Sequence, residues 1–370
     1  MAHYRILSFS AAILLCALSA CKGTATEPTA ATEPARTSAP PSTVAANPAK
    51  FLTQPLVTSL YTADPSAHVF DGKIYIYPSH DIETGVPQDA IGSRFDMKDY
   101  HVFSMSSVPG SVIDHGVALA LGDIPWASKQ LWAPDAAQKD GKYYLYFPAK
   151  DKEGVFRIGV AVSNKPAGPF SAQPNYIPGT FSIDPAVFAD SNERYIIFGG
   201  IRGGQLQRWS SGSYTSEDAY PAADQPALTP KIAKLSDDML SLGESLRDVV
   251  IQDESGKPLL AGDNARRYFE APWIHKYNGV YYLSYSTGDT HFIVYATSKN
   301  VYGPYTYRGK VLDPVLGWTN HQSIVEYRGK WYLFYHDSQI SGQTHLRNIK
   351  VTELKHRADG SIEPIDPYFE

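Results

Sequence analysis

Three carboxylic acids in this sequence occupy matching positions ahead of a repeated, tyrosine-rich segment. Asp64 and Asp184 each precede the anchor tyrosine of such a segment by 11 residues, and Glu270 precedes one by 12. Carboxyl groups brought within a few ångströms repel one another, so one of them must take a raised pKa or find a cation. A protonated acid, with a base or nucleophile on the opposite face, is what the cleavage of a glycosidic bond requires.

The same spacing reaches Trp132, 12 residues before its tyrosine, and His321, 11 residues before its own. Trp132 and Glu270 are both followed by Ala-Pro, so the extra residue is one shared local adjustment. The register predicts that Trp132 offers an aromatic surface to a sugar ring, although a tryptophan taken alone is more often part of a core. His321 is predicted to line the pocket or to neighbour a metal ion, whereas a lone histidine is usually a satisfied structural side chain.

Each carboxylic acid also has an ordinary explanation. Asp-Pro dipeptides, as at Asp64 and Asp184, commonly begin turns. Their shared register argues against that explanation. Glu270 is followed by the apolar pair Trp273 and Ile274, where a charged surface residue would be half buried without a reason. These three residues are therefore the catalytic candidates.

Five hairpins are expected to position them. Each combines a turn that contains Gly or Asn with a short strand rich in Tyr and branched residues. A repeat of this length is typical of a radial array of four-stranded sheets, so the sequence predicts an all-β, five-bladed β-propeller. The repeated segments are residues 71–77, 140–146, 191–197, 278–284 and 328–334.

The innermost strand of every propeller blade lines the central axis, so equivalent positions in five blades converge on one small volume. Further strands are expected at residues 156–162, 292–297 and 346–351, and one helix at residues 237–246. The alternative fold is a β-sandwich or β-solenoid with coincidental turns. That alternative does not explain why every copy of the repeat has the same element before it.

The first 50 residues carry export signals. The apolar stretch Ile6–Leu18 follows a basic start and leads into a small-residue cleavage site, so residues 1–20 are expected to form a lipoprotein signal peptide. Leu-Ser-Ala-Cys at residues 18–21 resembles a bacterial lipobox, which implies that Cys21 is lipidated. An ordinary signal peptide with a chance cysteine is the alternative. Residues 21–50, rich in Thr, Ala and Pro, are expected to be a disordered tether.

Residues 51–370 contain no second Pro/Ser-rich break, so we expect a single catalytic domain there. The formal net charge of −5 and the pI near 6.1 argue against nucleic acid as a partner. Contact with the membrane is expected only through the lipid anchor. Lys22 occupies the position where an inner-membrane retention signal usually has Asp, which favours an exported lipoprotein at the outer membrane.

Four motifs, in order along the chain, resemble glycoside hydrolase family 43. Residues 77–82 and 95–104 narrow the resemblance to a branch of exo-acting β-xylosidases and α-L-arabinofuranosidases. The likeness covers essentially all of residues 51–370. The four motifs are Thr-Ala-Asp-Pro at 62–65, Leu-Trp-Ala-Pro-Asp at 131–135, Ser-Ile-Asp-Pro at 182–185 and Phe-Glu-Ala-Pro-Trp at 269–273.

The resemblance implies a role for each candidate. Asp64 would be the general base that activates water, and Glu270 the general acid. Asp184 would raise the pKa of that acid and hold it in orientation. Arg347 matches an arginine that holds sugar hydroxyls and sets carboxylate pKa values, with an exposed strand residue as the alternative. The family inverts the anomeric centre, which requires the acid and the base to lie roughly 6.5–9.5 Å apart.

Some members of the family bind calcium or another cation on the axis, near the histidine that matches His321. No loop dense in Asp or Asn accompanies it here, so any such ion is expected to be structural and largely water-coordinated. No cofactor is expected to be required. The sequence has no His-Glu-x-x-His, no phosphate-binding Gly loop and no Gly-x-Ser-x-Gly, the motifs of competing enzyme classes.

The expected function is an inverting exo-glycosidase that releases terminal xylose, arabinofuranose or both from plant hemicellulose oligosaccharides. Two inserted segments, residues 78–99 and 205–244, are long enough to wall off a pocket for terminal units. One alternative is an endo-acting arabinanase of the same fold, which would need an open groove. The other is a non-catalytic lipoprotein that binds oligosaccharides, although such a protein gains nothing from clustered negative charge.

Overall fold

The computed structural model describes residues 50–369. The predicted signal peptide, Cys21 and the predicted tether up to residue 49 lie outside the described residues. Within residues 50–369, none of the helical segments reaches the length and apolar character that crossing a bilayer requires.

Across residues 50–369, 20 strands form five sheets, which we call blades 1 to 5 in chain order. Blade 1 contains β1 (Tyr61–Phe70), β2 (Lys73–Asp81), β3 (Asp99–Met105) and β4 (Val112–Ala120); blade 2 contains β5 (Asp135–Lys139), β6 (Lys142–Lys150), β7 (Phe156–Ser163) and β8 (Ser171–Ala172). Blade 3 contains β9 (Ala186–Asp190), β10 (Glu193–Phe198), β11 (Lys231–Lys234) and β12 (Arg247–Asp248). Blade 4 contains β14 (Glu270–Tyr277), β15 (Val280–Ser286), β16 (Ile293–Ser298) and β17 (Tyr305–Leu312), with β13 (Ile251–Gln252) parallel to β17; blade 5 contains β18 (Gln322–Tyr327), β19 (Lys330–Asp337) and β20 (Asn348–Leu354).

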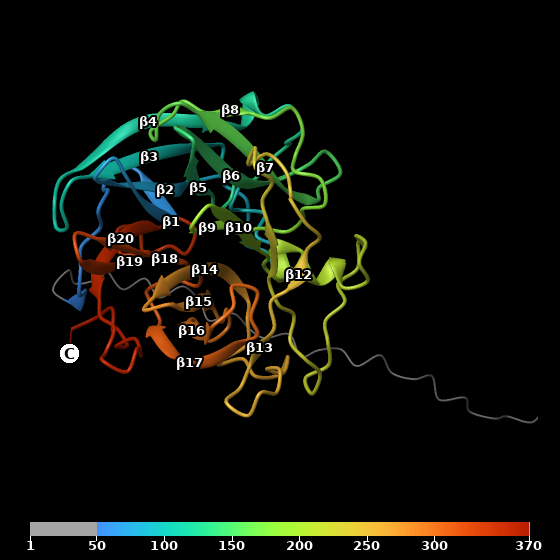
Figure 1. Ribbon diagram of the computed structural model, residues 1–370. Coiled ribbons are helices and arrows are strands. Elements are labelled where there is room, and N and C mark those ends of the chain that lie inside the picture. Colours follow the sequence, from blue (N-terminus) through green and yellow to red (C-terminus); the bar gives the residue numbers. More distant parts are fainter. Residues whose placement is uncertain (1–49, 370) are drawn as a thin grey trace, which may run out of the picture. The chain divides into compact units, whose positions relative to one another are not determined.

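The first strands of the five blades form a closed ring. The contacts run from β1 to β5, β9, β14 and β18, and β18 contacts β1 again. Figure 1 shows these five strands toward the middle, with β4 and β8 at the outer ends of their sheets. The predicted five-bladed β-propeller is therefore confirmed.

The five predicted hairpins are present, and their turns explain the repeated sequence. The first turn residue of each has a φ between 47° and 54°, a left-handed conformation that two-residue hairpin turns require. In four of the five turns the next residue is a glycine, which adopts positive φ without steric cost. The first turn residues are Asp71, Asp140, Ser191, Asn278 and Arg328.

Two details of the expected architecture are wrong. Blade 5 has three strands within the described residues, and blade 4 gains β13 as a fifth. The helix expected at residues 237–246 is absent, and turns and a bridge between Leu235 and Leu242 occupy that segment. Asp238 accepts hydrogen bonds from Ser236 Oγ and from the Leu240 N–H, and such local side-chain bonds compete with helix formation. The strands expected at 156–162, 292–297 and 346–351 are confirmed as β7, β16 and β20.

The hydrophobic core lies between the blades. Fully buried aromatic side chains, such as Phe147, Phe198 and Phe334, fill the seams between neighbouring sheets. Near its start, the described chain also bonds to blade 5: the Leu56 N–H, a few residues before β1 of blade 1, donates to Ile349 O of β20. Each blade is therefore held on both sides, which fixes the positions of the first strands around the axis.

Candidate active site

The three predicted catalytic residues lie at the beginnings of first strands, where the backbone is irregular. Asp64 in β1 and Asp184 just before β9 have left-handed φ values of 51° and 57°. The pairing of β1 shifts register after Ala63, and that of β14 shifts after Glu270. Such bulges re-aim side chains, and here they occur beside Asp64 and Glu270. Aspartate tolerates the left-handed region better than most residues, which suits this use.

Asp64 is held ionised by a set of donors. Its Oδ1 accepts a hydrogen bond from Arg347 Nη1 at 2.9 Å, and its Oδ2 accepts one from Ser79 Oγ at 2.5 Å. Burial by itself would raise the pKa of Asp64, but the Arg347 charge, with His336, His321 and Ser79, lowers it to about 2. Arg347 carries this effect at neutral pH, because burial keeps the pKa of both histidines well below 6.5 and so leaves them uncharged.

Arg347 is itself fixed by Asp81, at the end of β2. Its Nε and Nη2 donate to the two oxygens of Asp81 at 2.8 and 2.7 Å, a bidentate pair. The Arg347 backbone N–H also donates to Asp81, and Nη1 reaches Thr319 Oγ1 at 3.2 Å. Both charged side chains are buried. Sequence analysis did not identify Asp81, although it lies inside the family-like segment 77–82.

Glu270 has the opposite charge state. Burial is the largest influence on its carboxyl group, and the negative charge of Asp64 adds to it. Arg347 and Arg202 counteract both effects only in part, so the pKa of Glu270 rises to about 8. At neutral pH Glu270 therefore carries a proton that it can donate.

Asp184 lies against Glu270 and shares its electrostatic environment. Burial, followed by the charges of Glu270 and Asp64, raises the pKa of Asp184 well above its usual range. Asp184 Oδ2 also accepts a hydrogen bond from the Ala271 N–H at 2.8 Å, which favours its ionised form. This bond counteracts the rise in the pKa of Asp184 only in part, so Asp184 and Glu270 both hold protons more tightly than ordinary carboxylic acids do.

His321 joins this cluster from the residue before β18. Its Nδ1 lies 3.7 Å from Asp64 Oδ1 and 4.0 Å from Asp184 Oδ2, so one ring nitrogen lies near both carboxyl groups. Burial lowers the pKa of His321 to about 4, which makes the ring neutral at pH 7. The structure thus brings Asp64, Asp184, Glu270, His321 and Arg347 together.

Trp132 lies one aromatic ring away from the charged cluster. Its Nε1 donates to Phe95 O, and the Phe95 ring lies beneath the Arg347 guanidinium, 5.1 Å from its centroid. A Cβ atom at Gly92 or Gly203 would lie 2.9 or 3.1 Å from the Trp132 ring, so both positions require glycine for this close approach. Gly92 belongs to the inserted segment 78–99, and Gly203 lies two residues before the segment 205–244.

A second arginine, which sequence analysis missed, faces Glu270. Arg202 begins the short 3-10 turn η3 (Arg202–Gly204), and its positive charge acts to lower the pKa of Glu270. The guanidinium lies over the rings of Phe269 and Trp318 and pairs with Asp289 at 2.7 Å. No sequence motif marks Arg202, because its partners come from distant segments.

The residues around His321 do not fit a calcium ion bound by protein oxygens. Asp135 is the next carboxylate whose charge reaches His321. One of its oxygens accepts hydrogen bonds from Ser66 and His68, and the other accepts one from the Val187 N–H. Ca²⁺ takes six to eight oxygen ligands, and this carboxylate is already engaged. No catalytic step is therefore assigned to calcium.

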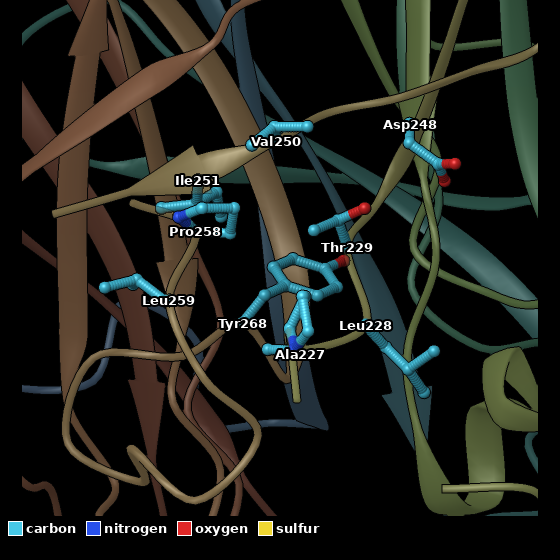
Figure 2. Close-up of a pocket in the computed structure, with 10 residues that line it drawn as sticks. Ala227, Leu228, Thr229, Asp248, Val250, Ile251, Pro258, Leu259 and Tyr268 are labelled. Atoms are coloured by element: carbon cyan, nitrogen blue, oxygen red, sulfur yellow. The ribbon is translucent and has the colours of Figure 1, made fainter. Parts of the chain in front are cut away.

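A separate hollow of about 210 Å³ lies beside blade 4 and is lined mostly by apolar side chains. Figure 2 shows the Tyr268 ring within it, together with Ile251 and Pro258. The one carboxylate in its lining, Asp248, pairs with Lys231. This hollow therefore lacks the acid and base that distinguish the axial cluster.

Comparison with known proteins places this geometry in a family. The model of the glycosyl hydrolases family 43 matches residues 53–362. The chain belongs to glycosyl hydrolase family 43.

This family 43 protein is similar in sequence to several named enzymes. Xylosidase/arabinosidase 43A of Humicola insolens is 57% identical over 319 residues, which are 83% of this chain and 98% of the relative. A xylosidase/arabinosidase of Bacteroides ovatus is 56% identical over 314 residues, 84% of this chain and 97% of the relative. A crystal structure of a β-xylosidase/α-arabinofuranosidase from a compost metagenome superposes with a TM-score of 0.85 at 66% identity. The match covers 86% of this chain and 98% of that one. That structure is a complex with xylotriose in a calcium-free form.

Glu270 should make the stability of this family 43 protein depend on pH. Its pKa is about 8 in the folded protein against 4.5 in the unfolded chain, so the stability that its proton contributes is present below pH 4.5 and is lost as the pH rises through 8. We expect Glu270→Gln to be more stable than the wild type at pH 9. The difference in unfolding free energy should grow by about 2–3 kcal/mol between pH 5.5 and pH 9.

Urea unfolding at the two pH values measures this difference. Glu353→Gln is the matched control, because Glu353 is on the surface and pairs only with Lys330. A Glu270→Gln effect that is the same at both pH values would contradict a buried, protonated Glu270.

Proposed function

We propose that this protein is an inverting, exo-acting glycosidase that removes terminal xylose, arabinofuranose or both from hemicellulose oligosaccharides. The observation that carries the proposal is the opposite charge state of two carboxyl groups in one buried cluster. Asp64 has a pKa of about 2 and Glu270 a pKa of about 8. Between these values, one group is a base and the other an acid, as hydrolysis with inversion requires.

The proposed reaction is a single displacement. Asp64 accepts a proton from a water molecule while the water oxygen bonds to the anomeric carbon. Glu270 donates its proton to the oxygen of the leaving sugar as the glycosidic bond breaks. Asp184 holds the acid in orientation and keeps its pKa high through negative charge. Exchange with solvent then returns the proton to Glu270, and no covalent sugar intermediate forms.

Three further side chains are proposed to bind the sugar. Four of the five N–H groups of the Arg347 guanidinium donate to Asp64, Asp81 and Thr319. One N–H group on Nη2 is left to donate to a sugar hydroxyl. His321 is neutral and lies near two carboxyl groups, so it can donate or accept a hydrogen bond at the sugar. Trp132 supplies an aromatic wall.

Contact between the first inserted segment and η3, which directly precedes the second one, supports action on terminal units. A Cβ atom at Gly203 would lie 2.9 Å from Ile91 O, so the segments around these residues pack directly against each other beside Trp132. Such packing closes one side of the site. An endo-acting enzyme would need that side open to let a chain run through, which makes this alternative the weaker one.

The names and ligands of relatives support the substrate class. The relatives include xylosidase/arabinosidases and a β-xylosidase of Xylanibacter ruminicola, and a family 43 enzyme of Xanthomonas citri has been solved with xylotriose. The non-catalytic alternative is disfavoured, because a binding protein has no use for an acid kept protonated at neutral pH.

The sequence of residues 1–21 supports export and lipidation of the protein. We propose export through the signal peptide at residues 1–20, lipidation at Cys21 and an outer-membrane location facing the periplasm or the surface. No cofactor is needed for the proposed steps. A structural, water-held cation near His321 stays part of the proposal, in keeping with a relative that was solved in a calcium-free form.

Substitution of the acid and of the base should respond differently to the leaving group. Glu270→Ala should lower kcat on xylobiose by about 10²–10⁴-fold, but much less on nitrophenyl β-D-xylopyranoside, because nitrophenolate leaves without a proton. Asp64→Ala should lower kcat by a similar large factor on both, because both need an activated water. Steady-state kinetics of the two variants on the two substrates measure this, with the paired arabinofuranoside as a further substrate. Equal losses for Glu270→Ala on both substrates would remove its assignment as the acid.

The configuration of the first product tests the single displacement. We expect hydrolysis of a β-D-xyloside to release α-xylose first, since water attacks from the face opposite the leaving group. Proton NMR during the first minutes distinguishes the anomers before mutarotation mixes them. Initial β-xylose would indicate retention and a covalent intermediate instead.

A further inference from the structure

A second cluster of chemically capable side chains lies in blade 1, outside the carboxyl cluster on the axis. It consists of His80 near the end of β2 and of Asp99 and His101 on β3. One ligand atom from each residue lies within 4.8 Å of the others. Among residues 50–369 this is the one group of three such side chains with that spacing.

The three side chains come together where β2 ends and β3 begins. His80 Nδ1 lies 2.6 Å from Asp99 Oδ1, and His101 Nε2 lies 4.0 Å from the same oxygen. The side chains of the three residues are between 13% and 26% exposed, so an ion from solvent can reach them.

A fourth residue orients His101 in the manner of a metal ligand. Asp114 on β4 lies 3.0 Å from His101 Nδ1, so this nitrogen carries the proton and donates to the carboxylate. The other nitrogen, Nε2, is left near Asp99 Oδ1 at 4.0 Å, which is too long for a direct hydrogen bond. Carboxylate–histidine pairs of this kind commonly support metal sites.

The strand geometry also favours a metal site at this position. The pairing of β3 with β4 shifts register on both sides of His101, and such bulges re-aim a side chain. On β2, the pairing with β3 spans Ile74–Ile76 and ends before His80 and Asp99 are reached. At the position of the cluster, the two strands therefore have no backbone ladder to hold them together.

We propose that His80 Nδ1, Asp99 Oδ1 and His101 Nε2 bind a late first-row divalent metal ion, with Zn²⁺ as the best match. Two imidazole nitrogens and one carboxylate oxygen suit zinc in a tetrahedral site, with water as the fourth ligand. Calcium prefers a shell of oxygen atoms and fits poorly. On binding, the ion takes the place of the proton at His80 Nδ1, and the neutral ring then carries its proton at Nε2.

The ion would join the two ends of the segment between β2 and β3. That segment contains Gly92 and Phe95, which contact Trp132. His80 also directly precedes Asp81, the residue that holds Arg347. The proposed site therefore clamps the base of a loop that walls the sugar pocket, and its expected effect is on the stability of that loop.

Isothermal titration of the purified full chain, first stripped with EDTA, with ZnCl₂ tests the proposal. We expect one saturable zinc site per chain. The double variant His80→Ala/His101→Ala should weaken zinc binding by about 100-fold or more, and Asp114→Asn by about 10–100-fold through loss of the supporting carboxylate. His115→Gln is the matched control, since His115 is exposed on the same blade and bonds only to Ser104; it should bind zinc like the wild type.

Two further readouts make the result decisive. Co²⁺ in place of Zn²⁺ should give the visible absorption bands of a tetrahedral site in the wild type and not in the double variant, and CaCl₂ should not compete. Far-UV circular dichroism checks that the variants are folded, and Asp114→Asn leaves both proposed imidazole ligands in place. The proposal is overturned if the wild type has no saturable zinc site, or if the folded double variant binds zinc as tightly as the wild type.

Discussion

The guanidinium of Arg347 lies between two buried carboxylates and donates to both, with Asp81 on one side and Asp64 on the other. A buried arginine needs such partners, because its charge cannot be neutralised by losing a proton. Asp81 fixes the position of the guanidinium, and Asp64 is the acid that gains from it. Because Asp64 and Asp81 both pair with Arg347, less positive charge is left to offset the negative charges of Glu270 and Asp184. The protonation of Glu270 therefore follows from its burial and, after that, from the ionisation of Asp64.

The propeller makes this arrangement available by geometry. Five first strands contact one another in a ring, so residues far apart in sequence meet at the beginnings of those strands. The seams of aromatic side chains between blades fix the strands, and the bulges at Ala63 and Glu270 turn the acids toward one another. Rigid placement matters here because a proton donor and a base act only within hydrogen-bond reach of the substrate.

Much of this could be predicted from the sequence, because a repeat carries its own register. The two-residue turns at Asp71 and its four equivalents gave the hairpins, and counting back from them gave Asp64, Asp184, Glu270 and His321, which the structure brings together. Asp81 and Arg202 could not be found in this way. Both act through partners that are distant in sequence, and neither occupies the repeated position. The helix expected at 237–246 failed because Ser236 and Asp238 form a local turn, and the cluster of His80, Asp99 and His101 is visible only once β2 and β3 lie side by side.

The dependence of both acids on Arg347 is the central claim, and the pH profile of kcat/KM tests it most directly. In the Arg347→Met variant Asp64 loses its cation, so the acidic limb should move up by about one pH unit or more. Glu270 loses a charge that lowers its pKa, so the alkaline limb should also move to higher pH. Movement of both limbs in the same direction, measured on the residual activity against the wild type, is the predicted result. Limbs that stay at the wild-type pH values while only the rate falls would contradict the account.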